Sequence, residues 1–72
     1  MSHSPSKSFG TNVAYERSRR ALSMRALAER ANMHGSEISR LEGGTRDPRL
    51  STMIRIARAL EVSLVDLLRD VG

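Results

Sequence analysis

The sequence predicts an all-α, compact domain of five short helices. Apolar residues recur at spacings of three and four, which is the period of an amphipathic helix. No segment alternates apolar and polar residues over the length that a half-buried strand needs. Glycine, proline or a good capping residue separates each apolar segment from the next. A chain of 72 residues holds at most one such domain, and because it has no cysteine it cannot build a disulfide framework or a cysteine-ligated metal site.

The first eight residues differ in composition from the rest. Residues 1–8 read MSHSPSKS, with four serines, one proline and no aliphatic residue after the initial methionine. Such a segment buries too little apolar surface to offset the entropy lost on ordering, so we expect a disordered N-terminal tail. Helical spacing starts at Phe9, and the first helix is expected to end near Ala21. The folded domain is therefore predicted over residues 9–72.

Two short helices are predicted next. Ser23 is a good N-cap, because its hydroxyl can accept a hydrogen bond from an early backbone N–H of a helix. The second helix is expected over residues 24–31, and Asn32 tolerates the left-handed conformation that ends a helix. The third helix is expected over residues 35–42, with His34 as its cap and two glycines after its end.

The last two helices have the clearest amphipathic pattern. The fourth helix is expected to carry one apolar face at spacings of three and four, formed by Leu50, Met53, Ile56, Ala57 and Leu60. Ser51 or Thr52 is its expected cap. Ser63 and Asp66 then form a pair like a capping box, with Asp where Glu or Gln is usual. They introduce a fifth helix from Leu64 to about Arg69.

Residues 24–43 meet the steric requirements of a helix-turn-helix motif. The fifth position must be small because the two helices cross steeply, and it is Ala28. The ninth position needs a positive φ and is usually glycine, and Asn32 is the next best choice. The positions that point to the core are all apolar: Leu27, Ala31, Met33, Ile38 and Leu41.

With these residues the sequence resembles the phage repressor and Cro-like helix-turn-helix proteins, called the xenobiotic-response-element family in bacteria. That family's pattern includes, in order, R-x-x-R-G-L-S, L-A-x-x-A-G, I-S-x-[IL]-E-x-G, P-x-L and L-A-x-A-L-x-V-S. The chain carries RSRRALS at 17–23, LAERANM at 27–33, ISRLEGG at 38–44, PRL at 48–50 and IARALEVS at 56–63. The resemblance covers about residues 9–69 and implies a lambda-repressor-like DNA-binding domain.

Three residues depart from the family pattern. Met24 stands where a glutamine that often touches a phosphate is frequent, so we expect no such contact here. Glu16 stands where an aliphatic residue is common, which predicts weaker packing of the first helix. Gly35 replaces a long polar residue at the start of the third helix, so one base contact is expected to be absent.

The resemblance implies that the helix over residues 35–42 is the recognition helix, whose N-terminal side enters the major groove of DNA. Arg40 is the best expected base reader, because a guanidinium can bond O6 and N7 of guanine together. The alternative is that Arg40 pairs with Glu37 or Glu42. Ser36 and Glu37 are the other expected base readers, although Ser36 could be merely solvated and Glu37 could interact with the positive end of its own helix.

Phosphate contacts are expected from residues that flank the recognition helix. The N-terminus of the helix over residues 24–31 favours an anion because of its free N–H groups and its dipole. The expected contacts are Arg20, Ser23, Arg25, His34, Ser39, Thr45, Arg46 and Arg49. Some of these residues are expected to be only solvated. By resemblance, Glu42 is structural and is tied to Arg17 or Arg20.

A homodimer is expected, because one recognition helix reads only about half a site and two-fold dimers read two half-sites. The fifth helix and the residues after it carry more apolar surface than one thin helix needs for its own core. The residues assigned to this dimer interface are Leu64, Val65, Leu68 and Val71. For Leu64 the alternative is a place in the core of the monomer.

The charge balance agrees with a polyanionic partner. Twelve basic against eight acidic residues give a net charge of +4, and the surplus lies mainly in residues 9–30, beside the helix-turn-helix window. The sequence therefore predicts a cytoplasmic, sequence-specific transcriptional regulator of the repressor or Cro-like type, which binds double-stranded DNA at a palindromic operator. The alternative is a protein-interaction module on the same fold, such as an antitoxin or adaptor whose partner is a toxin or RNA polymerase.

An enzyme is not expected. The sequence has no nucleophile–base pair, paired carboxylates, phosphate-binding loop or set of metal ligands. We therefore expect no catalytic residue, no cofactor and no metal. The longest apolar runs are a few residues, so no contact with a membrane is expected either.

Overall fold

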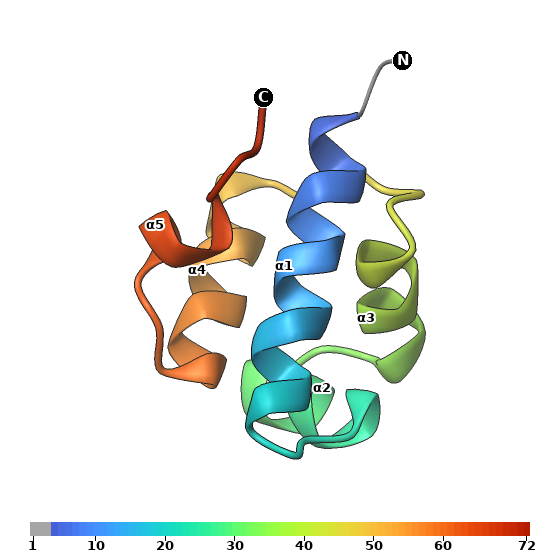
Figure 1. Ribbon diagram of the computed structural model, residues 1–72. Coiled ribbons are helices and arrows are strands. Elements are labelled where there is room, and N and C mark those ends of the chain that lie inside the picture. Colours follow the sequence, from blue (N-terminus) through green and yellow to red (C-terminus); the bar gives the residue numbers. More distant parts are fainter. Residues whose placement is uncertain (1–3) are drawn as a thin grey trace.

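The computed structural model describes residues 4–72, which form helices joined by turns and contain no strand (Figure 1). The helices are α1 (Pro5–Arg19), α2 (Met24–Ala31), α3 (Gly35–Glu42), α4 (Leu50–Leu60) and α5 (Leu64–Leu67). The predicted all-α class with five helices is confirmed. The predicted bounds of α2 and α3 are also confirmed. The predicted cap of the fourth helix, Ser51 or Thr52, is wrong, because α4 begins at Leu50 with Arg49 as its N-cap, and α5 ends two residues before the predicted boundary.

The helices surround one small apolar core. In Figure 1, α1 runs through the middle of the molecule, α4 and α5 lie on one side of it, and α3 lies on the other. The buried apolar residues come from all five helices: Phe9, Val13, Leu27, Ala28, Ala31, Ile38, Leu41, Ile56, Ala57, Ala59, Leu60 and Leu67. Of the core positions predicted in the helix-turn-helix window, four are buried and Met33 is partly buried.

The prediction of a disordered tail over residues 1–8 is wrong for residues 5–8. The structure begins α1 at Pro5, four residues before the predicted start at Phe9. Residues 1–3 of the predicted tail lie outside the described residues. At its other end α1 stops at Arg19 and not near Ala21, which has a positive φ of 55°.

Local capping and a distant contact together order the start of α1. Ser4 is the N-cap, and its hydroxyl accepts a hydrogen bond of 3.1 Å from the N–H of Lys7. Pro5 suits the first turn, because its fixed φ is helical and the N–H that it lacks would have no partner within the helix. Ser6 is buried, and its hydroxyl donates to the carboxylate of Asp47 in the loop between α3 and α4. Composition alone could not reveal this tertiary contact.

α1 and α3 approach closely at Gly10. A Cβ at this position would overlap the carbonyl oxygen of Leu41 and lie 2.8 Å from that of Glu42. Gly10 is therefore the point at which the backbone of α1 touches the end of α3. The contact fixes where the predicted recognition helix sits on the rest of the domain.

Glu16 is buried at the centre of an ionic cluster. Its side chain is 4% exposed, and its carboxylate lies 2.7 Å from Arg20, 3.6 Å from Arg19 and 3.8 Å from Arg69. Asn12 adds hydrogen bonds of 2.9 and 2.8 Å to the carbonyls of Leu67 and Arg69. Polar contacts thus join α1 to the C-terminal segment at the place where the family pattern has an aliphatic residue. The sequence-based expectation of weaker packing did not include these partners.

Within residues 4–72, none of the helices has the length and the apolar composition needed to cross a lipid bilayer.

Candidate nucleic-acid interface

The turn between α2 and α3 has the conformation that the motif requires. Asn32 ends α2 in the left-handed region, with φ 56° and ψ 50°. The N–H of Met33 donates to the carbonyl of Ala28 at 2.8 Å, which closes the end of α2. Ile38 and Leu41 are buried, so one side of α3 packs against the core. These contacts set the angle between the two helices and leave the other side of α3 exposed.

That outer side carries most of the predicted base readers. Ser36, Ser39 and Arg40 are exposed, while Glu37 is half-buried. The hydroxyl of Thr45, just after α3, donates to the carbonyl of Arg40 at 3.2 Å. The fold therefore brings the predicted base readers and two predicted phosphate contacts, Ser39 and Thr45, to the same surface.

Arg40 has no acidic partner within 4.0 Å among the described residues. The alternative of an ion pair with Glu37 or Glu42 is therefore not the arrangement in the structure. Glu42 is bound by Arg17, and Glu37 accepts a hydrogen bond at the start of α3. The guanidinium of Arg40 remains exposed for a ligand.

Glu37 caps its own helix. His34 occupies the N-cap position, and its backbone N–H donates to Oε1 of Glu37 at 2.9 Å. The carboxylate also lies in the first turn, where the helix dipole favours a negative charge. These contacts match the structural alternative for Glu37. Its role as a base reader remains a prediction, because one of its oxygens is already engaged.

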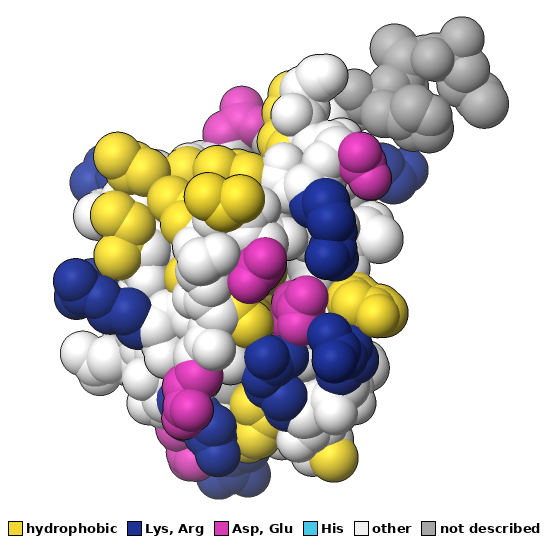
Figure 2. All heavy atoms as spheres, turned by 60° about the vertical axis from the view of Figure 1, so that its left-hand side comes forward, with side chains coloured by type: hydrophobic (Ala, Val, Ile, Leu, Met, Phe, Trp, Pro, Cys, Tyr) yellow, Lys and Arg dark blue, Asp and Glu magenta, His cyan; other side chains and the backbone are white. Residues whose placement is uncertain are grey.

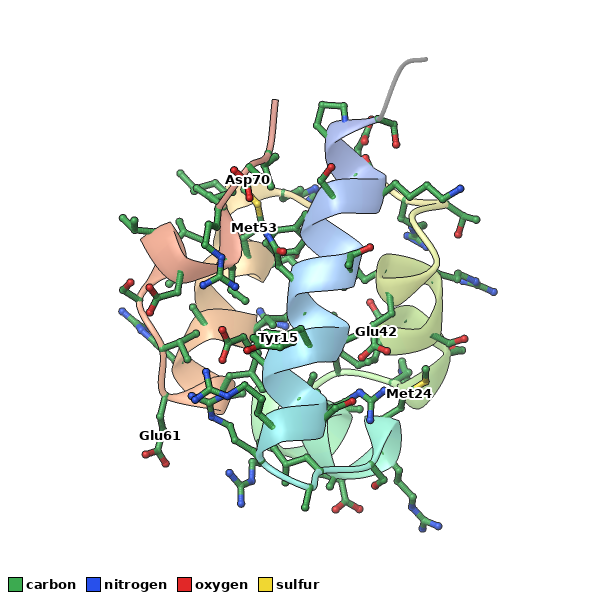
Figure 3. All side chains as sticks on the ribbon, viewed as in Figure 1. Tyr15, Met24, Glu42, Met53, Glu61 and Asp70 are labelled. Atoms are coloured by element: carbon green, nitrogen blue, oxygen red, sulfur yellow. The ribbon has the colours of Figure 1, made fainter. Side chains whose placement is uncertain are left out.

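Glu42 is tied to Arg17 and not to Arg20. Nε and Nη2 of Arg17 donate to the two oxygens of Glu42 at 2.6 and 3.0 Å, between α1 and α3 (Figure 3). Nη1 of Arg17 also donates to the carbonyl of Leu22 at 2.7 Å. The hydrogen bond to Glu42 raises the pKa of Arg17. This bidentate pair holds the end of α3 against α1.

The predicted phosphate contacts differ in how free their side chains are. Arg20 is half-buried, and its guanidinium binds the carboxylate and the carbonyl of Glu16. Ser23 caps α2, and its hydroxyl accepts from the N–H of Ala26 at 2.9 Å. Arg25 is exposed and lies 4.0 Å from Glu29, an ion pair that is weak in water. Arg20 is therefore the least available of these three side chains for a phosphate.

The loop from residue 45 to residue 49 carries two further arginines beside α3. Arg46 and Arg49 are both exposed, and they line a mostly polar hollow of about 280 Å³. Glu37 and Thr52 contribute to the same hollow, which lies between α3 and the start of α4. The hollow thus continues the exposed surface of α3 toward the loop.

The comparison with protein families decides the assignment. The helix-turn-helix family model matches residues 13–67, which include the whole of α2, α3 and α4. The chain belongs to the helix-turn-helix family. It is a DNA-binding transcriptional regulator, as the resemblance implied.

Solved structures with the same fold are regulators of several kinds. The clp gene regulator ClgR from C. glutamicum is 22% identical, with a TM-score of 0.91 over 94% of this chain and 88% of that one. The restriction-modification controller protein C.AhdI from Aeromonas hydrophila is 26% identical, with a TM-score of 0.84 over 86% of this chain and 94% of that one. The competence regulator ComR from Streptococcus vestibularis is 28% identical, with a TM-score of 0.86 over 96% of this chain and 23% of that one. No curated protein sequence matches the chain.

This helix-turn-helix protein has a second, apolar surface away from α3. Figure 2 shows hydrophobic side chains gathered on the side of the molecule that carries α4 and α5. Of the predicted dimer residues, Val65 is 77% exposed and Leu68 is 37% exposed, while Leu64 and Val71 are partly buried against the core. For Leu64 this contact agrees with the alternative of a place in the monomer core.

The apolar surface extends beyond the residues that the sequence predicted. Leu50, assigned to the inner side of its helix by spacing alone, is 60% exposed. A mostly apolar hollow of about 290 Å³ lies nearby, with Leu68 and Val71 in its lining. Its other lining residues come from the start of α1, from the loop before α4 and from α4: Pro5, Ser6, Phe9, Asp47, Pro48 and Met53. No pattern in the sequence predicted this hollow, because four separate segments form it.

Proposed function

We propose that this helix-turn-helix protein is a sequence-specific regulator that binds double-stranded DNA as a homodimer and reads a palindromic operator with α3. The observation that carries the proposal is Arg40, which is exposed on α3 while both acids near it in the sequence are engaged elsewhere. A free guanidinium at this place can bond O6 and N7 of a guanine together, with discrimination of about 1–3 kcal/mol. Ser36 and Glu37 are proposed as further base readers.

Phosphate contacts on both sides of α3 would hold it in the groove. We assign Ser23 and Arg25 to one side, at the start of α2, where free N–H groups favour an anion. Thr45, Arg46 and Arg49 lie on the other side, after α3. His34 and Ser39 are exposed beside the base readers and join this set, whereas Arg20 requires release from Glu16. Contacts of this kind fix the register of the protein on DNA and carry no sequence information by themselves.

The dimer is proposed to form through Val65 and Leu68, with Leu64 and Val71 behind them. Two observations support it. Val65 is an aliphatic residue with most of its side chain in water, and α5 lies on the side of α1 that is opposite α3 (Figure 1). A pairing through α5 would therefore leave both recognition helices free to enter successive turns of the major groove.

A protein-interaction role is the second candidate, and one observation favours it. Leu50 is exposed on α4, and the apolar hollow joins Leu68 and Val71 to residues of α1, of α4 and of the loop before α4, so the apolar surface extends beyond the residues proposed for the dimer. A protein partner such as a toxin or RNA polymerase could occupy this surface. The two roles are compatible, since the hollow does not include the residues proposed to touch DNA bases.

The proposed DNA binding is tested by a gel-shift series with the DNA upstream of the protein's own gene, at several salt concentrations. The logarithm of the binding constant should fall linearly with the logarithm of the salt concentration, by about 0.9 for each phosphate neutralised. Absent binding, or binding that does not change with salt, would contradict the proposal. Since the proposed ligand is chromosomal or phage DNA, we place the protein in the cytoplasm.

A further inference from the structure

The first turn of α1 packs directly on the loop that follows the recognition helix (Figure 1). Gly44, with φ +74°, is so close to α1 that a Cβ on it would lie 2.8 Å from Cα and 3.0 Å from Cβ and Cγ of Lys7. Ser6 strengthens the contact through its hydrogen bond to Asp47. Lys7 therefore belongs to the same part of the molecule as Thr45 and Arg46, although the sequence places it in the predicted tail.

The charge of Lys7 is available for a ligand. Its side chain is exposed, and no carboxylate lies within 4.0 Å of it among residues 4–72. The first turn of α1 contains no acidic residue. The carboxylate of Asp47, the one acid in the adjoining loop from residue 45 to residue 49, accepts a hydrogen bond from Ser6. Lys7 and Arg46 carry two positive charges against the one negative charge of Asp47, so the surface formed by Lys7, Thr45 and Arg46 has a net positive charge.

We propose that Lys7 binds the phosphate backbone of DNA together with Thr45 and Arg46, so that the first turn of α1 extends the interface built around α3. The proposal rests on the DNA-binding function proposed above and adds to it a residue that the resemblance to the family did not assign. A lysine suits this place, because its ammonium is a compact charge on a flexible stem and can follow a phosphate without a fixed geometry. The packing of Gly44 on the stem of Lys7 keeps that charge beside the loop.

The salt dependence of binding tests the proposal quantitatively. The probe is a random-sequence duplex of about 20 base pairs, two helical turns long, titrated by fluorescence anisotropy between about 50 and 200 mM salt. Lys7→Gln should lower the log–log slope by about 0.9 and weaken binding on the order of fivefold near 0.1 M salt. Lys7→Arg should keep the wild-type slope. Arg58→Gln is the matched control, because Arg58 is exposed in the last turn of α4 and its loss removes the same charge from a place to which no DNA contact is assigned.

The results separate this proposal from the one on which it rests. If the wild-type protein binds with a steep slope and Lys7→Gln keeps that slope, the role of Lys7 is refuted while DNA binding stands. If Arg58→Gln lowers the slope as much as Lys7→Gln, the effect is one of net charge and the role of Lys7 is again refuted. If the wild-type protein does not bind the duplex, the DNA-binding function itself is contradicted. Equal thermal midpoints of the variants ensure that the slopes compare folded proteins.

A second measurement needs no variant, because Lys7 is the only lysine in the chain. Acetylation of its amine by an amine-reactive ester can be followed by mass spectrometry of the peptide that contains it. The duplex should slow acetylation of Lys7 several-fold at low salt, and salt that dissociates the complex should restore the rate. An equal rate with saturating duplex and without it would overturn the proposal.

Discussion

Arg40 and Arg46 have different expected roles, although both are exposed arginines near α3. Arg40 lies on the outer side of the recognition helix, where a side chain can reach base edges. Arg46 lies in the loop after it, where contacts go to phosphates. A base contact discriminates between sequences, and a phosphate contact strengthens binding to all of them.

Substitution of these two arginines tests whether Arg40 contacts bases and Arg46 contacts phosphates. Arg40→Ala should weaken binding to the specific site by about 1–3 kcal/mol and change binding to random DNA little. Arg46→Ala should weaken binding to both by a similar factor and lower the salt slope by about one. Anisotropy titrations with the two duplexes give both quantities. If Arg40→Ala leaves the ratio of specific to non-specific binding unchanged, Arg40 is not a base reader.

The pair of Arg17 and Glu42 is expected to matter for stability. Glu42→Ala leaves the largely buried guanidinium of Arg17 without its bidentate partner, and urea denaturation should show a loss of about 2–3 kcal/mol. Glu29→Ala is the control, because it also removes a helical glutamate from an ion pair with arginine, but both side chains of that pair are exposed. Its effect should stay within about 0.5 kcal/mol. Equal effects of the two substitutions would show that the pair with Arg17 does not hold α3 in place.

Residue roles that depend on local spacing could be predicted, and those that depend on distant packing could not. Asn32 at positive φ and the capping pair Ser63–Asp66 follow from neighbours within a few positions, and the structure confirms both. The tie of Glu42 to a basic residue of the first helix came from the resemblance, and the structure selects Arg17. The buried ionic environment of Glu16 could not be predicted from the sequence, because its partner Arg69 lies at the far end of the chain.

At the scale of elements, the packing of α1 on α3 determines where the recognition helix points. The two backbones touch at Gly10, and a methyl group there would overlap the carbonyl oxygen of Leu41. Backbone atoms cannot move aside as the end of a flexible side chain can. The position therefore requires glycine for reasons of space and not of φ.

Gly10→Ala should destabilise the domain strongly. We expect a loss of about 3 kcal/mol or more in the free energy of unfolding, because α1 and α3 must separate to admit the methyl group. Gly35→Ala, at the first position of α3, is the matched control, since a Cβ there meets nothing within 4 Å. Its thermal midpoint should equal or slightly exceed that of the wild-type protein. A Gly10→Ala variant as stable as Gly35→Ala would contradict the packing of α1 on α3.

The start of α1 shows why an element boundary can escape prediction. The composition of residues 4–8 predicts disorder, yet a capping serine, a proline in the first turn and a buried contact of Ser6 with Asp47 make these residues helical. By contrast, the caps and the apolar spacing of α2 and α3 lie in adjacent residues, so the bounds of these two helices were predicted correctly. The N-cap of α4 is Arg49, which makes no side-chain capping hydrogen bond, so residue type did not reveal where this helix begins.

At the scale of the whole molecule, the proposed base readers and the proposed dimer residues lie on opposite sides of α1, while the apolar hollow reaches the start of α1 and the loop before α4, next to proposed phosphate contacts. The residues proposed to touch DNA lie on α3 and beside it, whereas the apolar surface lies over α4 and α5 (Figures 1 and 2). Because the domain is small, the proposed dimer contacts and the proposed recognition helix use different sides of one core. Such an arrangement makes the two functions separable by substitution.

Val65→Asp should produce monomers. Val65 is the most exposed large apolar residue of the described chain, so the substitution adds a charge at the proposed interface without entering the core. Sedimentation equilibrium should give the mass of a dimer for the wild-type protein and of a monomer for the variant, with an unchanged helical circular dichroism spectrum. Leu50→Asp, at another exposed leucine, should leave the dimer intact. If the dimer is lost with Leu50→Asp but kept with Val65→Asp, the interface lies near Leu50 and the apolar hollow. The pairing through α5 is then refuted.

The central claim is that α3 and the segments beside it form the DNA interface. A backbone amide NMR titration of the whole protein with a duplex of about 20 base pairs tests it most directly. The largest shifts should fall in residues 35–42, with further shifts at Lys7, at the start of α2 and in residues 44–49. Shifts centred on α5 and the apolar hollow, with α3 unchanged, would contradict the claim.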